Sequence, residues 1–348
     1  MNFLMSNDLG VDLGTSNVLI NVDGKGIVVK EPTVVAMDRN DGKILQVGAA
    51  ARIMMGRTPG NVVAMKPLNG GIISDHEMTV RMLSSMFKSA SKGGLLAPKP
   101  RVVITVPSGI TEVEERNVIN AAIEAGARRV FLIEEPLASA LGAGLDLASA
   151  KGHMVVDIGG GTTNIAVLSM NSVVMSSSLR IGGDYFDEVI SRYIRRKYGM
   201  VIGQVTAEAI KINLGQVYPG GEELAMEVKG RDTKGNPRTI DITSTEVFGI
   251  LQKHAATIAD EVMDVLSQTS PELVGDIAQT GITLTGGCAQ IAGMDKLIEE
   301  KTQIPCVVAD DPASCAAYGC GKSLAWINSM REGPINIARK RMMRAVQK

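Results

Sequence analysis

The chain has 348 residues, which suggests two domains, and its 36 basic and 37 acidic residues leave a net charge of −1 at pH 7. This balance argues against a dedicated nucleic-acid binder, which usually carries a clear basic excess. The four cysteines form no Cys-x-x-Cys pair and only three histidines accompany them, so no zinc site is expected. Unpaired thiols fit a reducing compartment such as the cytoplasm.

Two similar segments predict that the fold is duplicated. In residues 9–22 and again in residues 154–168, an apolar strand ends in an aspartate and is followed by a glycine turn with hydroxyl side chains and a second apolar strand. The second copy begins near the middle of the chain. We therefore expect two related halves with a cleft between them.

Strands and helices alternate through both halves, which indicates an α/β protein. Apolar runs predict strands at residues 102–106, 130–133 and 282–285. Helix-start signals at Thr111, Asp184 and Thr245 predict helices that end near residues 125, 198 and 268. Residues 31–66 and 181–245 are expected to be insertions with strands of their own.

The two glycine turns predict a phosphate site. A glycine turn presents backbone N–H groups to an anion without a side-chain barrier, and neighbouring hydroxyls add donors. Asp12 and Asp157 end the strands before the turns and would face the same anion, so a Mg²⁺ ion held through water is the expected mediator. The alternative is that both segments are ordinary hairpin turns, where Asp and Gly are common.

Two further strand ends carry candidate residues. Glu134 and Glu135 stand between a strand and a helix, where one of them could orient a water for attack on a phosphate or simply stabilise the helix N-terminus. The turn at residues 285–289 is suited to letting a flat base lie against the backbone. The Gly-Lys-Ser at residues 321–323 lacks the earlier glycine of a P-loop, and no Gly-x-Gly-x-x-Gly fingerprint supports a Rossmann site.

Together these features resemble the actin/Hsp70/hexokinase superfamily and, more closely, the MreB family of bacterial actins. The resemblance covers essentially the whole chain except the last fifteen residues. It rests on the segments GRTPG (56–60), KPL (66–68), FLIEEP (131–136), DIGGGTT (157–163), RIGGD (180–184) and PELVGDI (271–277).

The resemblance implies an actin-like ATPase fold of two duplicated RNase H-like lobes, each with a smaller inserted subdomain, around a nucleotide cleft. The expected division is subdomain IA at residues 1–30, 67–145 and 320–335, IB at 31–66, IIA at 146–180 and 246–319, IIB at 181–245, and a basic tail at 336–348.

The resemblance also implies roles for individual residues, with ATP or ADP and Mg²⁺ as cofactors. Glu135 and Thr162 would position the hydrolytic water, and Glu208 and Lys211 would contact ribose and base. The full set of expected nucleotide contacts is Gly14, Thr15, Ser16, Asn17, Gly159, Gly160, Gly161, Thr162, Glu208, Lys211, Gly286, Gly287, Cys288 and Ala289.

The chain departs from the usual family pattern at four positions. Ser16 replaces a frequent Ala, Asn164 a frequent acid, Ala209 a usual Arg and Cys288 a third Gly. The change at Ser16 is mild, whereas those at Ala209 and Cys288 affect the fit around the nucleoside and suggest a divergent paralogue. Because Glu135 and Thr162 are kept, hydrolysis is expected to persist.

Membrane contact is a further expectation from the resemblance. Leu95 and Leu96, between glycines and a proline, could enter the membrane interface or instead cap the core. The tail at residues 338–348 has five basic residues and no acid, and either attracts anionic lipid or is simply solvated.

The leading hypothesis is a polymerising ATPase that forms double, antiparallel filaments on the inner face of the cell membrane and determines cell shape. Its expected partners are further copies of itself, the membrane, and membrane proteins of cell shape or wall synthesis, with no nucleic acid. The alternatives are a small-molecule kinase, for which no acceptor pocket can be named, and an Hsp70-like chaperone, for which the chain lacks room for a peptide-binding domain.

Overall fold

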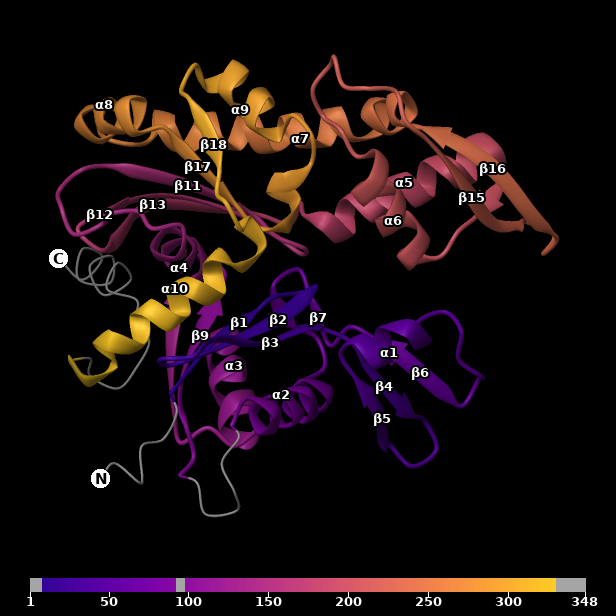
Figure 1. Cartoon of the computed structure of the whole chain (residues 1–348), viewed down its shortest axis with the longest axis horizontal. Coiled ribbons are helices and arrows are strands. Elements are labelled where there is room, and N and C mark those ends of the chain that lie inside the picture. Colours follow the sequence, from indigo (N-terminus) through magenta and orange to yellow (C-terminus); the bar gives the residue numbers. More distant parts are fainter. Residues whose placement is uncertain (1–7, 92–97, 330–348) are drawn as a thin grey trace.

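The computed structural model describes residues 8–91 and 98–329, which form two lobes, each built on a five-stranded sheet (Figure 1). The first sheet has the order β10-β9-β1-β2-β3 and the second the order β13-β12-β11-β17-β18. The strands of the first are β1 (Leu9–Leu13), β2 (Asn17–Val22), β3 (Gly26–Pro32), β9 (Arg101–Val106) and β10 (Arg129–Glu134). Those of the second are β11 (His153–Ile158), β12 (Thr163–Ser169), β13 (Ser172–Leu179), β17 (Ile282–Thr285) and β18 (Cys306–Val308).

The two sheets repeat one topology. In each, three consecutive strands pair antiparallel, and two later strands add in parallel beside the first of them. The predicted α/β class and the duplication are therefore confirmed. The parallel strands β9, β11 and β17 are nearly all buried because helices or the opposite lobe cover both of their faces.

Each lobe also carries a smaller three-stranded sheet, and both small sheets lie towards the right in Figure 1. In the first lobe it consists of β4 (Val35–Asp38), β5 (Ile44–Val47) and β6 (Val62–Met65), with α1 (Ala49–Met54) beside it. In the second it consists of β14 (Met200–Val201), β15 (Ala225–Asp232) and β16 (Pro237–Thr243), with α5 (Gly183–Tyr198) and α6 (Gln204–Leu214). A short hairpin, β7 (Leu68–Asn69) and β8 (Ile72–Ile73), follows β6.

The remaining long helices cover the outer faces of the large sheets. They are α2 (His76–Ala90) and α3 (Glu112–Glu124) on the first lobe, and α7 (Ser244–Ser267), α8 (Pro271–Thr280) and α9 (Met294–Thr302) on the second. None of the helices in the described ranges is both long enough and apolar enough to span a bilayer. All four cysteines are free and buried.

Helix starts were predicted with mixed success. Thr111 forms the expected capping box with Glu114. The prediction at Thr245 is wrong by two residues, because Thr243 accepts from the Glu246 amide and Glu246 reaches back to the Thr243 amide. Asp184 is also not a cap: Gly182 precedes α5, and Asp184 lies in its first turn, where an acid favours the helix dipole.

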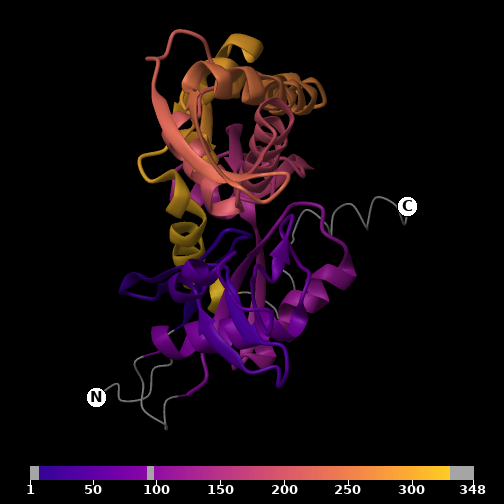
Figure 2. The same ribbon diagram turned by 90° about the vertical axis from the view of Figure 1, so that its right-hand side faces the viewer.

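Two helices cross between the lobes, α4 (Glu135–Gly142) and α10 (Cys315–Ser323), the latter preceded by the 3₁₀ turn Pro312–Ser314 (Figures 1 and 2). A Cβ on Gly319 would lie 1.7 Å from the Ala138 carbonyl oxygen, and one on Gly142 would lie 1.8 Å from the Cys315 carbonyl oxygen. Glycine at these two positions therefore lets α4 and α10 pack closely, and Gly319 to Ser323 lie within helix α10. An apolar cluster that includes Phe131, Leu141 and Leu168 joins the two lobes at this crossing.

Candidate functional site

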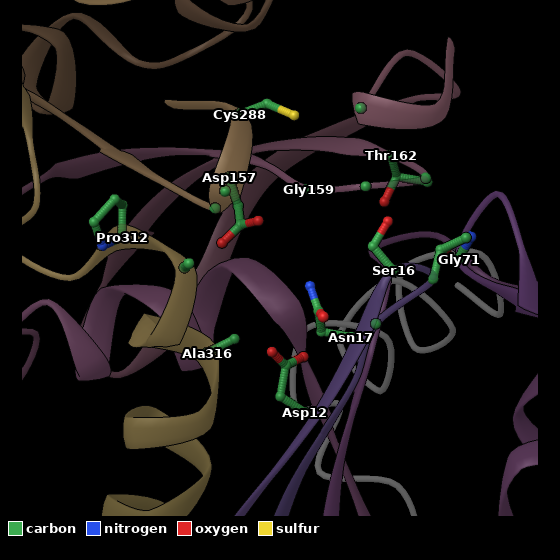
Figure 3. A pocket seen from close by; sticks show the side chains of 18 of the residues that line it. Asp12, Ser16, Asn17, Gly71, Asp157, Gly159, Thr162, Cys288, Pro312 and Ala316 are labelled. Carbon is green, nitrogen blue, oxygen red and sulfur yellow. The ribbon is translucent and has the colours of Figure 1, made fainter. Parts of the chain in front are cut away.

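A cavity of about 520 Å³ lies between the lobes, where β1, β11 and β17 of the two sheets end. It is lined by almost all of the residues that the sequence singled out, drawn from both halves of the chain (Figure 3). These are Asp12, Gly14, Thr15, Ser16, Asn17, Glu135, Asp157, Gly159, Gly160, Gly161, Thr162, Glu208, Lys211, Gly286, Gly287 and Cys288. Ala289 follows directly and is buried, but it does not line the cavity.

The two glycine turns have the same geometry and face each other. In the first, the Gly14 amide donates to the Asn17 carbonyl at 3.1 Å, and in the second the Gly159 amide donates to the Thr162 carbonyl at 2.9 Å. Figure 3 shows Ser16 and Thr162 on opposite sides of the same gap.

The turns also touch across the cleft, because the second turn has no side chains at its tip. A Cβ on Gly160 would lie 2.2 Å from Ser16 Oγ, and one on Gly161 would lie 2.3 Å from Thr15 Oγ1. Glycine is therefore required at both positions for the hydroxyls of the first turn to approach the backbone of the second. The ordinary-hairpin alternative does not account for this mutual contact.

Asp12 and Asp157 point into the cavity from the two lobes (Figure 3). Thr105 Oγ1 donates to Asp12 Oδ1 at 3.0 Å. Asp157 Oδ2 accepts from Ser139 Oγ, and from Thr285 Oγ1 at 2.7 Å. Burial raises the pKa of both carboxyls, with Asp157 adding to the effect on Asp12 and the hydroxyl donors opposing it.

Glu135 is the third buried acid of the cavity and the first residue of α4. Burial raises its pKa well above the usual value, and the charges of Asp157 and Asp12 add to this. Its Oε2 accepts from Asn164 Nδ2 at 2.7 Å. Glu134, by contrast, accepts from Ser108 Oγ at 2.8 Å and does not line the cavity. Of the two adjacent acids, only Glu135 can meet a ligand there.

Three acids around one polar cavity create a place where a cation would be stabilised, since each carboxylate is desolvated and repelled by the others. In residues 8–91 and 98–329 no cluster of three or more Asp, Glu, His or Cys side chains is arranged to hold a metal alone. Carboxylates are ligands that Mg²⁺ accepts, and a Mg²⁺ ion beside these acids would have to take its other ligands from water and phosphate.

The Asp12→Asn variant should be more stable than the wild-type protein when no nucleotide is present. Burial and Asp157 raise the pKa of Asp12 from 3.8 to about 7. Between pH 3.8 and about 7, Asp12 has lost its proton in the unfolded chain but keeps it in the native state. The free energy of unfolding of the wild type therefore falls as the pH rises through this range. Above pH 7 the native state holds a buried charge that Asn lacks.

Thermal unfolding at a series of pH values measures this effect. At pH 8 the gain in free energy of unfolding should be about 1 kcal/mol or more. It should shrink as the pH falls to 5, because the native Asp12 is then protonated. A gain that does not change with pH would show that charge is not its cause.

Two ion pairs bridge the cleft and were not predicted from the sequence. Arg52 of α1 pairs with Glu208 of α6, and Lys66 Nζ lies 2.6 Å from Asp184 Oδ1 in α5. Lys66 also donates to Ser16 Oγ at 3.4 Å. Glu208, expected at the ribose, thus holds the two small subdomains together in this conformation.

Lys211 and Cys288 line the cavity next to Gly183. Lys211 Nζ lies 2.8 Å from Asp187 Oδ1 and donates to the Gly183 carbonyl at 2.9 Å, so its ammonium group is already paired. Burial raises the pKa of the Cys288 thiol to about 11, which keeps it neutral. Cys288 therefore acts as a small apolar wall of the cavity beside Gly286 and Gly287.

The expected membrane residues Leu95 and Leu96 and the basic tail lie outside the residues that the structure describes.

Comparisons with known proteins agree with this geometry. The family model for the MreB/Mbl protein matches residues 6–332. Cell shape-determining protein MreB of Escherichia coli (strain K12) is 49% identical over 330 residues, covering 93% of this chain and 95% of that protein. Cell shape-determining protein Mbl of Bacillus subtilis (strain 168) is 47% identical over 322 residues, covering 92% and 96%.

Solved structures show the same fold. MreB5 of Spiroplasma citri bound to AMPPNP superposes with a TM-score of 0.87 at 36% identity, covering 93% of this chain and 98% of that one. The MamK double helical filament superposes with a TM-score of 0.79 at 22% identity, covering 92% and 99%, which supports the fold alone. The expected actin-like fold is confirmed, and the chain belongs to the MreB/Mbl family.

Proposed function

We propose that this protein is an ATP-binding and ATP-hydrolysing bacterial actin that assembles into filaments and determines cell shape. The observation that carries the proposal is the cavity between two facing glycine turns, with Asp12, Asp157 and Glu135 around it. It is supported by the relatives: the Escherichia coli and Bacillus subtilis proteins are named cell shape-determining proteins, and the Spiroplasma citri structures were solved with AMPPNP and with ADP.

In this proposal the two turns hold the phosphates. The backbone of residues 14–17 and 159–162, with the hydroxyls of Thr15, Ser16 and Thr162, donates hydrogen bonds to the phosphate oxygens. The base lies against the backbone of Gly286 and Gly287, with Cys288 and Ala289 behind them, and the sugar lies towards Glu208 and Lys211. Glu208 must share its carboxylate with Arg52, so nucleotide binding competes with one cross-cleft ion pair.

Glu135 and Thr162 act on the attacking water. Hydrolysis of a terminal phosphate is mainly a matter of orienting water and stabilising charge, and a carboxylate with a raised pKa is a stronger proton acceptor than an ordinary one. A Mg²⁺ ion held through water by Asp12 and Asp157 would neutralise charge on the phosphates. Its binding would also relieve the repulsion among the three acids.

The proposal extends to assembly and location. The filaments would be double and antiparallel, would lie in the cytoplasm on the inner face of the cell membrane, and would engage membrane proteins of cell shape or wall synthesis. The division into subdomains IA, IB, IIA and IIB and a tail at residues 336–348 is part of this proposal.

Sedimentation with and without Mg-ATP tests the function. The protein should pellet at high speed with Mg-ATP and stay in the supernatant without nucleotide. An added arm with sugars and other small acceptors tests the kinase alternative. A protein that stays in the supernatant in every nucleotide state and transfers phosphate to an acceptor would refute the proposal.

Replacing Leu95 and Leu96 by Ser should weaken co-sedimentation with anionic liposomes, since two leucines would no longer enter the apolar interface. Removing residues 338–348 should weaken it further, by about 1 kcal/mol for each basic residue near the surface. Pelleting in the absence of liposomes is the control. If the doubly altered protein binds liposomes as the wild type does, membrane contact through these segments is wrong.

A further inference from the structure

We propose that Asn164 is a positioning residue, which orients the Glu135 carboxylate toward the phosphate end of the cavity and is itself oriented by Ser178. The inference rests on the proposed hydrolysis of ATP, because Glu135 is the residue assigned to the attacking water. It concerns the second residue of β12, one position beyond the second glycine turn.

The Asn164 amide contacts both groups assigned to the water. Its Nδ2 donates to Glu135 Oε2 at 2.7 Å and lies 3.3 Å from Thr162 Oγ1. Asn164 is completely buried, and its backbone is held between β11 and β13. A rigid strand thus carries the donor, and the donor determines where the Glu135 carboxylate sits.

Ser178 sets the direction of the amide. It stands opposite Asn164 on β13, the edge strand of the sheet, and its Oγ donates to Asn164 Oδ1 at 2.8 Å. With Oδ1 accepting from Ser178, the NH₂ group must face Glu135. The chain Ser178–Asn164–Glu135 therefore runs from the sheet edge to the cavity through two directed hydrogen bonds.

The amide of residue 164 suits the charges around it. Asp12 and Asp157 already face Glu135 across the cavity. An amide supplies the hydrogen bond to Glu135 without adding charge, whereas the acid that is frequent at this position in the family could supply one only while one of the two carboxyls keeps a proton.

The test compares kcat and KM for ATP in four single variants. Asn164→Leu has a similar size and removes the donor without adding charge, and it should lower kcat by about tenfold or more with KM within about twofold. Ser178→Ala should lower kcat by a smaller factor. Ser178→Thr keeps the hydroxyl and should therefore have a kcat close to that of the wild type. Ser176→Ala, two residues earlier on the same strand and opposite Ala166, is the matched control with unchanged kcat.

A double variant isolates the coupling. In a Glu135→Gln background, Asn164→Leu should cause little further loss of kcat, because the residue through which it acts is already disabled. Should Asn164→Leu fail to fold, the Ser178 variants decide, since Ser178 is exposed on the edge strand.

The outcomes separate this inference from the function on which it rests. Wild-type kcat in both Asn164→Leu and Ser178→Ala, with Glu135→Gln inactive, would overturn the inference alone. Loss of ATP affinity in proportion to kcat would show a merely structural role and would also overturn it. Unchanged phosphate release in Glu135→Gln would overturn the role of Glu135 together with the inference, and a wild-type protein that releases no phosphate from ATP would overturn the hydrolysis proposal.

Discussion

Glu135→Gln should lower the rate of phosphate release by about a hundredfold or more, while ATP still binds and filaments still form with it. The amide keeps the size of the side chain and its hydrogen bond from Asn164, but it cannot accept a proton from the attacking water. The nucleotide contacts assigned to the two turns are untouched. Phosphate release and nucleotide affinity, measured on one preparation, check this.

The adjacent acid provides the matched control. Glu134 lies outside the cavity and is bound by Ser108, so Glu134→Gln should leave the rate of phosphate release close to that of the wild type. If Glu135→Gln instead abolishes ATP binding, the carboxylate is structural and the water is activated by another group. If only Glu134→Gln is inactive, the assignment of the two acids is reversed.

Gly319→Ala should destabilise the native state by about 3 kcal/mol, a large effect for one added methyl group. The new Cβ would lie 1.7 Å from the Ala138 carbonyl oxygen, so α10 and α4 would have to move apart. Because these helices cross between the lobes, their separation should also weaken nucleotide binding in the cleft. Chemical denaturation and nucleotide titration measure the two effects.

Gly249→Ala is the control for this variant. Gly249 also lies in a helix, α7, but an added Cβ would meet nothing within 4 Å. Alanine there should stabilise the protein by about 0.5–1 kcal/mol, because glycine loses more backbone freedom on folding. A Gly319→Ala protein as stable as Gly249→Ala would show that the helix crossing tolerates a wider spacing.

The phosphate turns could be predicted from the sequence because their signal is local. An apolar strand, an aspartate, glycines and hydroxyls stand consecutively in residues 9–17 and 154–163, and the turn geometry follows from that order. The start of α7 had an equally local signal, since Thr243 and Glu246 have the spacing of a capping box. The prediction at Thr245 missed it by choosing a threonine without a partner three residues later.

The cross-cleft ion pairs could not be predicted, because their partners are far apart in the chain. Arg52 and Glu208 belong to different inserted segments, and no pattern around either residue indicates the other. The role proposed for Asn164 could not be predicted for the same reason, because its hydrogen-bond partners are also distant in the chain. The sequence marks residue 164 as a departure from a pattern, but only the register of β12 against β13 places Ser178 beside it.

Electron cryomicroscopy of the Glu135→Gln protein assembled with Mg-ATP tests the central claim most directly. The account predicts filaments in which the phosphates lie between residues 14–17 and 159–162, with a metal ion near Asp12 and Asp157 and the terminal phosphate next to residue 135. Filaments with the nucleotide elsewhere, or with this cavity empty, would contradict it.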